Sequence, residues 1–80
     1  MAVTVVFIGK LADLAGTAER EIAAPLTWAG LLDALGAHVA EAARDERTKI
    51  AVNGEVLADK ATLVADDGDE IALLPPVSGG

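Results

Sequence analysis

Residues 70–76 read EIALLPP, a short aliphatic run that ends at two consecutive prolines. The Asp-Gly pair at 67–68 is typical of a tight turn, so the run is bounded on both sides. Because proline has no backbone N–H to donate to a sheet, a strand over 70–74 has to end at Pro75. The sequence therefore predicts a strand that stops abruptly and is followed by VSGG at 77–80.

Three other segments are candidates for strands. VTVVFI at 3–8 is rich in β-branched residues and is followed by a glycine. KIAVNGEVLA at 49–58 predicts a hairpin, because Asn53-Gly54 supplies the two residues of positive φ that a type I′ turn needs. AEREIAA at 18–24 is either a strand paired with the first one or an extended loop.

The helical signals come from the middle of the chain. KLADLAG at 10–16 predicts one helical turn, and Thr27 is a candidate N-cap of a longer helix. Four large apolar residues then recur at the spacing of one helix face, namely Trp28, Leu31, Leu32 and Leu35. Gly36 is a candidate end of this helix, and residues 37–47 either extend it or restart it.

Together these elements predict an α+β fold of two layers, with one main helix packed on a sheet of four or five strands. Eighty residues are enough for one domain with a small core. We assign residues 1–74 to the domain and residues 75–80 to a flexible tail that ends in Gly-Gly.

Side-chain alternation predicts an apolar patch on the sheet face that the helix leaves open. If Val5 and Ile71 point toward the helix, residues at odd spacing from them point away. The hairpin register likewise turns one valine outward. The patch expected from this parity contains Ile8, Val56 and Leu74. Scattered exposed aliphatic residues are common, but we interpret these as a contact surface because Leu74 adjoins the tail.

Composition limits the partners and the compartment. Thirteen acidic residues against six basic ones give a formal net charge of −7, which disfavours nucleic acid and anionic membranes and favours a positively charged protein. The chain has no cysteine, so it offers neither a disulfide nor a thiol nucleophile. We recognise no signal peptide and no bilayer-spanning run, and we therefore expect the protein to be cytoplasmic.

The side chains present no convincing catalytic, cofactor or metal site. His38 is the only histidine, and we assign it no role. DDGDE at 66–70 lacks the spacing of a calcium loop and is interpreted as a solvated acidic turn. We therefore expect no bound cofactor and no metal.

The tail is the remaining candidate. A rigid double proline follows the last strand directly, and Gly79 and Gly80 have no Cβ, so they could enter a channel too narrow for any side chain. Six extended residues reach about 20 Å, which would bring the Gly80 carboxylate into another protein's active site. The chain terminus is then the reactive group.

The sequence resembles the small, sulfur-carrying subunit of molybdopterin synthase, a ubiquitin-like β-grasp family, over essentially its whole length. The resemblance rests on VTVVFIGKLADLAGT at the start, the helix after Thr27, AVNGE in the hairpin and, above all, DGDEIALLPPVSGG. This chain has Leu73 and Leu74 where members of that family commonly have aromatic residues.

The resemblance implies a chemistry for the tail. An activating enzyme related to ubiquitin E1 would use ATP to adenylate Gly80, and sulfur would then replace AMP to give a thiocarboxylate. The tail would enter the large synthase subunit, in a heterotetramer, and donate sulfur to cyclic pyranopterin monophosphate. Matching residues of the extended tail are Pro75, Pro76, Val77, Ser78 and Gly79. The partners would supply the catalytic side chains, so this subunit alone is expected to be inactive.

Three alternatives remain open at this point. The first is a sulfur carrier for thiamine or another sulfur product, which shares the Gly-Gly chemistry. The second is a ubiquitin-like modifier whose Gly80 is joined to a lysine. The third is a binding module that uses only the sheet face and whose tail has no function.

Overall fold

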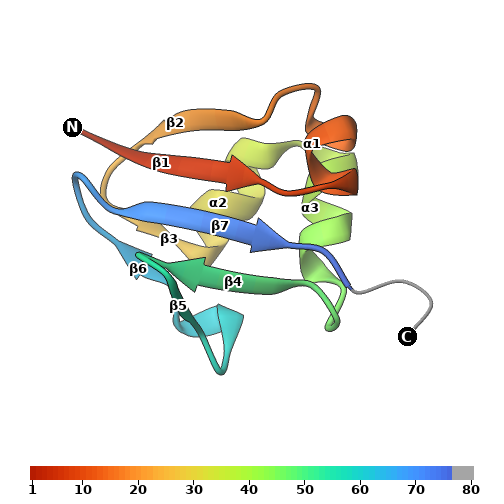
Figure 1. Cartoon of the computed structure of the whole chain (residues 1–80). Coiled ribbons are helices and arrows are strands. Elements are labelled where there is room, and N and C mark those ends of the chain that lie inside the picture. Colours follow the sequence, from red (N-terminus) through yellow and green to blue (C-terminus); the bar gives the residue numbers. More distant parts are fainter. Residues whose placement is uncertain (77–80) are drawn as a thin grey trace.

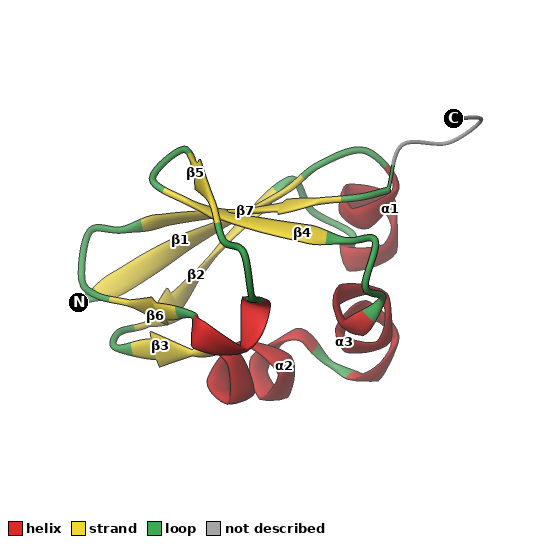
Figure 2. Cartoon of the chain, turned by 90° about the horizontal axis from the view of Figure 1, so that it is seen from below, coloured by secondary structure: helices red, strands yellow, loops and turns green. Residues whose placement is uncertain are grey.

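The fold is a sheet with helices packed on one face, as a computed structural model of the chain shows for residues 1–76 (Figures 1 and 2). The elements in chain order are β1 (Ala2–Phe7), α1 (Lys10–Ala15), β2 (Glu19–Ala23), β3 (Leu26–Thr27), α2 (Trp28–Leu35), α3 (Ala37–Arg44), β4 (Lys49–Val52), β5 (Glu55–Val56), the 3₁₀ helix η1 (Lys60–Thr62), β6 (Val64–Ala65) and β7 (Glu70–Leu74).

The main sheet has five strands in the order β2-β1-β7-β4-β5. The last strand, β7, lies in its centre, parallel to β1 and antiparallel to β4, and the other two pairings are antiparallel. Because strands from both ends of the chain pair here, every other element is contained in the connection between them. The mixed sheet of four or five strands expected from the sequence is confirmed, with five strands.

The helices cover one face of this sheet, and the opposite face is turned to the viewer in Figure 1. Figure 2 shows the same two layers from the side, with α2 and α3 beneath the strands. The Thr27 side chain accepts a hydrogen bond from the Gly30 backbone N–H at 3.2 Å, so the predicted N-cap is confirmed. Gly36, at φ 82° and ψ 163°, ends α2 and begins α3, so the helix restarts instead of continuing.

The core lies between the two layers and is built from aliphatic side chains. From the sheet, Val3, Val5 and Ile71 are completely buried, and from the helices so is Leu31. Phe7 is buried beside them, with 3% of its surface exposed. Alternate residues of β1 and β7 therefore face the helices, as the period-two pattern of the sequence predicted.

The structure decides between the alternatives left by the sequence and adds elements that it did not reveal. Residues 18–24 contain a true strand, β2, which pairs antiparallel with β1. The hairpin turn has the two predicted positive φ angles, 50° at Asn53 and 85° at Gly54. The expectation of one main helix was incomplete, because α2 and α3 share that role. The small sheet of β3 and β6 and the helix η1 were not predicted.

A lysine fastens η1 to the end of α3. The Lys60 ammonium donates to the carbonyl oxygens of Ala43 and Asp45, each at 2.7 Å, and lies 5.5 Å from the centre of the Trp28 ring. A cation at this position compensates the carbonyls that a helix leaves free at its C-terminus. Partial burial lowers the pKa of Lys60, while the nearby Asp45 carboxylate opposes that shift.

Replacing Leu31 by alanine should lower the free energy of unfolding by about 2–5 kcal/mol, because the fully buried side chain would leave a cavity under the sheet. The matched control is Leu14→Ala on α1, where 48% of the leucine is exposed and the expected loss is about 0.5 kcal/mol. Urea denaturation followed by circular dichroism measures both. Equal losses for the two variants would show that the core is not centred on α2.

Candidate functional site

The candidate site is the end of β7, where the chain leaves the centre of the sheet. Leu74 lies opposite Lys49 on β4, and the Ile8 backbone N–H donates to the Leu73 carbonyl at 3.3 Å on the other side. Pro75 and Pro76 follow and are half-buried. The strand stops where the sequence predicts, since Pro75 has no N–H to continue the ladder.

The first residue of the tail is placed against the start of α1. A Cβ built on Gly9 would lie 3.7 Å from Cγ of Pro75, which is ordinary van der Waals contact. The tail therefore begins beside the loop that joins β1 to α1. The other predicted tail residues, Val77, Ser78, Gly79 and Gly80, lie outside the residues that the structure describes.

The structure places the three predicted patch residues on the face or edge that the helices leave open. Ile8 is 42% exposed, Val56 is 55% exposed and Leu74 is half-buried. Ile8 and Leu74 are close to the start of the tail, whereas Val56 lies on the outer strand, across β4 from β7. Leu73, in contrast, is fully buried in the core, so only the second leucine before the prolines is on the open face.

Sequence reasoning missed what joins Val56 to the rest of this face. Paired positions run across four strands from Val6 through Ala72 and Ala51 to Val56. We call these four residues the apolar strip. Its two alanines make the middle of the open face flat. The small residues were visible in the sequence, but the parallel register that aligns Val6 with Ala72 was not.

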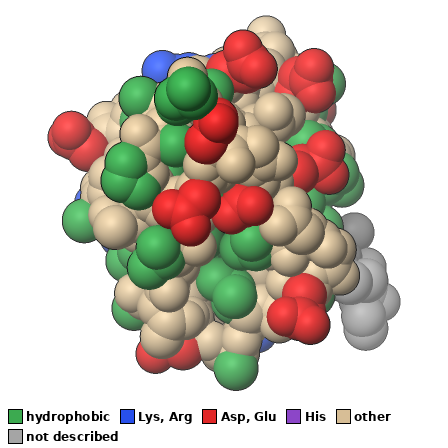
Figure 3. Space-filling view, turned by 90° about the vertical axis from the view of Figure 1, so that its left-hand side faces the viewer, with side chains coloured by type: hydrophobic (Ala, Val, Ile, Leu, Met, Phe, Trp, Pro, Cys, Tyr) green, Lys and Arg blue, Asp and Glu red, His purple; other side chains and the backbone are tan. Residues whose placement is uncertain are grey.

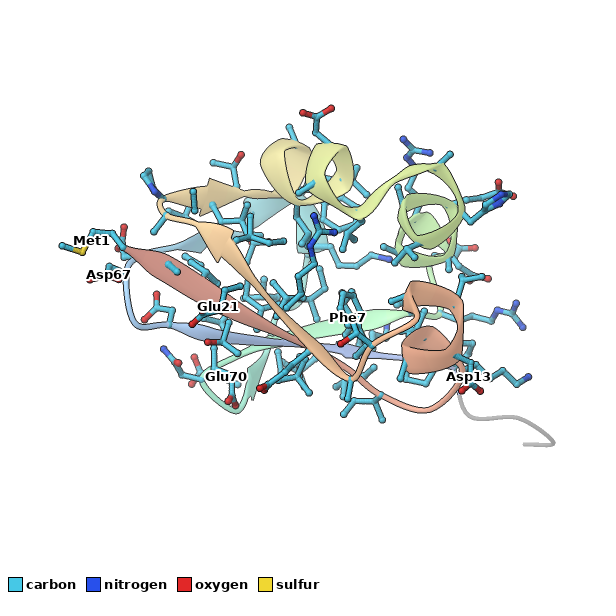
Figure 4. All side chains as sticks on the ribbon, turned by 90° about the horizontal axis from the view of Figure 1, so that it is seen from above. Met1, Phe7, Asp13, Glu21, Asp67 and Glu70 are labelled. Carbon is cyan, nitrogen blue, oxygen red and sulfur yellow. The ribbon has the colours of Figure 1, made fainter. Side chains whose placement is uncertain are left out.

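The acidic turn at 66–69 is held by hydrogen bonds. The Asp69 carboxylate accepts from the Asp66 backbone N–H at 2.8 Å and from the Asn53 side-chain amide at 3.1 Å. These two donors lower the pKa of Asp69, the backbone N–H having the larger effect. Asp67 accepts from the Ala2 backbone N–H at 2.9 Å, which ties the turn to the start of β1. Figure 4 shows Asp67 beside Met1.

Asn53 connects this turn with the β4–β5 hairpin. Its backbone N–H donates to the Glu70 carbonyl at 2.8 Å, and its side-chain oxygen accepts from the Glu70 N–H at 2.9 Å. The sequence identified Asn53 only as a turn former. The structure shows that it also joins two segments that are far apart in the chain.

Neither of the other sequence candidates forms a site within residues 1–76. His38 is exposed on α3. No group of three or more histidine or acidic side chains in this described part is arranged to hold a metal ion. The same residues contain no helix with the length and hydrophobicity needed to cross a bilayer.

The comparison with protein families decides the classification. Residues 5–80 match the sequence profile of the ThiS family. The chain belongs to the ThiS family.

Individual relatives agree with this classification. The ThiS-family chain is 36% identical to the molybdopterin synthase sulfur carrier subunit of Escherichia coli (strain K12), over 98% of this chain and 99% of the relative. The crystal structure of SAMP1 from Haloferax volcanii is 33% identical, with a TM-score of 0.73 and full coverage of both chains. A complex of subunits 1 and 2 of molybdopterin-converting factor from Helicobacter pylori 26695 contains a chain that is 30% identical, with a TM-score of 0.67 and full coverage of both chains.

These matches also settle the fold. The ThiS-family chain has the ubiquitin-like β-grasp fold, an α+β arrangement with a mixed sheet, as the resemblance of its sequence implied.

Replacing Asn53 by glycine should raise the pKa of Asp69 partway toward its ordinary value, because one donor is lost while the Asp66 N–H remains. Glycine also retains the positive φ of the turn. Carboxyl NMR titration measures the change. The control is Asp45 in the same sample: Arg47 lowers the pKa of that carboxyl to about 2, and this value should not move.

The sign of the stability effect follows from the direction of the shift. A carboxylate with a lowered pKa in the folded state stabilises the protein above its unfolded pKa, about 3.9, and this stabilisation is lost as the pH falls through the folded value. The acid-induced loss of stability should therefore be smaller in Asn53→Gly. An unchanged Asp69 titration would show that the Asn53 amide does not act on it.

Proposed function

We propose that this chain is the sulfur carrier subunit of molybdopterin synthase, and that its tail carries the sulfur. The observation that supports this most is the position of β7: the central strand of the sheet leads directly into PPVSGG, in a chain 36% identical to such a subunit from Escherichia coli. A strand held on both sides gives the tail a fixed origin.

The proposed chemistry takes place on the Gly80 carboxylate. A carboxylate is a poor electrophile, so an E1-like partner enzyme first joins it to the α-phosphate of ATP and releases pyrophosphate. A sulfur nucleophile from a donor then displaces AMP, and the product is a thiocarboxylate. ATP is consumed by the partner, and the chain itself binds no cofactor. Because both steps need ATP and cytosolic enzymes, we place the reaction in the cytoplasm.

In the second stage the charged tail enters the large catalytic subunit and transfers sulfur to cyclic pyranopterin monophosphate. The solved Helicobacter pylori structure contains subunits 1 and 2 of its converting factor together, which supports a partner of this kind. We propose that the assembled synthase is a heterotetramer and that catalytic side chains belong to the large subunit. This chain alone would then be inactive.

The open face of the sheet is the surface that would hold the partner while the tail enters it. Ordering the tail opposes binding by about 1–2 kcal/mol per residue in backbone entropy. Burial of the apolar groups Ile8, Leu74 and Val56 can offset that cost. Pro75 and Pro76 reduce it, because their φ angles are already restricted.

A second function is favoured by one group of relatives. Two of the solved structures that resemble this chain are named small archaeal modifier protein 1. In a modifier, the activated Gly80 would form an amide bond with a lysine of another protein. Conjugates in cell extract that disappear when Gly80 is deleted would support this use. A carrier for thiamine or another sulfur product would instead fail with cyclic pyranopterin monophosphate, and a pure binding module would function without Gly79 and Gly80.

Incubation with ATP, a sulfur donor and the cognate activating enzyme should increase the intact mass by the difference between sulfur and oxygen, localised to Gly80 by fragmentation. Deleting Gly79 and Gly80 should abolish the increase without changing the circular dichroism spectrum, since neither residue belongs to the core or the sheet ladder. The activating enzyme must be shown to work on another carrier. No increase with that competent enzyme would refute the sulfur-carrier function.

Replacing Leu74 by glutamate should weaken binding to the large subunit by about tenfold or more, because a charge would enter an apolar contact. Val56→Glu should act in the same direction. The matched control is Val64→Glu, at a valine that is 63% exposed on β6 and outside the main sheet. Isothermal titration calorimetry measures all three. Equal weakening by Val64→Glu would mean that the contact surface is misplaced.

A further inference from the structure

The open face of the sheet carries a pair of carboxylates at a distance from the tail. Thr4 on β1 is paired with Glu21 on β2 and with Glu70 on β7, so the two glutamates flank it on the same face. Figure 4 labels both side chains, which lie on this part of the sheet. Both residues are exposed. Glu19, opposite Val6, extends the acidic side of the face by one more position.

The arginine between these acids does not neutralise them. Arg20 points to the helical side of the sheet, where its guanidinium donates to the Ala34 carbonyl of α2 at 2.8 Å. Among the strand residues that the structure describes, the registers leave Lys49 as the basic residue on the open face, and it lies opposite Leu74, near the tail. Figure 3 shows acidic side chains across the end of the molecule away from the tail, with basic ones only at the margins.

The open face therefore has two different halves. The half beside the tail contains Leu74, Ile8 and Lys49, and the half away from it contains Glu21 and Glu70. The apolar strip runs between them, and its small side chains allow another protein surface to approach closely. Four residues of β7 separate Glu70 from Leu74, which is about 13 Å along a strand.

We propose that the large catalytic subunit docks on this face with arginine or lysine side chains opposite Glu21 and Glu70, while its channel receives the tail at the other half. This inference rests on the proposed function and adds the chemistry of the partner's surface. Contact at two points about 13 Å apart fixes the rotation of the carrier, which contact at the base of the tail alone would leave free. Carboxylates at the edge of an interface mainly speed and orient the encounter.

The charges argue against other occupants of the same face. Nucleic acid and anionic membrane surfaces are repelled by a carboxylate pair with no basic neighbour in the strands. A metal ion would need more ligands than the described residues bring together. A basic protein surface is the complementary partner.

The test compares two double variants that remove the same charge from different layers. Glu21→Gln with Glu70→Gln neutralises the open face, whereas Asp33→Asn with Glu41→Gln neutralises exposed acids on α2 and α3. Stopped-flow association with the purified large subunit from the same organism is measured at low and high ionic strength. We expect the open-face variant to associate roughly 3–10-fold more slowly at low salt, with little difference at high salt. The helical variant should stay close to the unaltered protein.

Equal slowing by the two variants would overturn the inference, because net charge alone would then explain the effect. So would unchanged association of the open-face variant. If the unaltered protein binds the large subunit and carries sulfur, those results leave the proposed function intact. If the unaltered protein does not bind the large subunit at all, the proposed function and this inference both fail.

Discussion

The parallel pairing of β1 with β7 is the constraint on which the rest of this structure depends. Parallel neighbours cannot be joined by a tight turn, so the connecting chain has to cross from one end of the sheet to the other. Here that connection contains every other strand and helix of the domain. Val5 and Ile71, which face each other across this pair, are both completely buried in the centre of the core. Weakening this one ladder would separate the core and release the base of the tail together.

The same pairing gives the candidate site its character. A C-terminal segment that must enter another protein needs mobility at its tip and a fixed position at its base. Hydrogen bonding of β7 on both sides supplies the fixed base, and the prolines end the strand without a turn that would fold the chain back. The helices occupy the other face, so the surface around this base is free for a partner.

Much of this could be predicted from local patterns. Alternation in VTVVFI and EIALL assigned residues to the two sheet faces, and Asn53-Gly54 predicted its turn, because these signals depend on neighbours in sequence. Registers between distant strands could not be predicted in this way. For that reason the apolar strip, the pairing of Glu21 and Glu70 around Thr4, and the second role of Asn53 were found only in the structure. The two-residue strands β3 and β6 are too short to have a periodicity of their own.

The direction of the strands also determines how this domain can be built into larger polypeptides. Because β1 and β7 run the same way, the start of β1 and the end of β7 lie at opposite ends of the sheet, as Figure 1 shows. A folded module attached ahead of Ala2 would sit far from Pro75 and would not obstruct entry of the tail into a partner. The architecture therefore permits fusion at one end while the other remains available for chemistry.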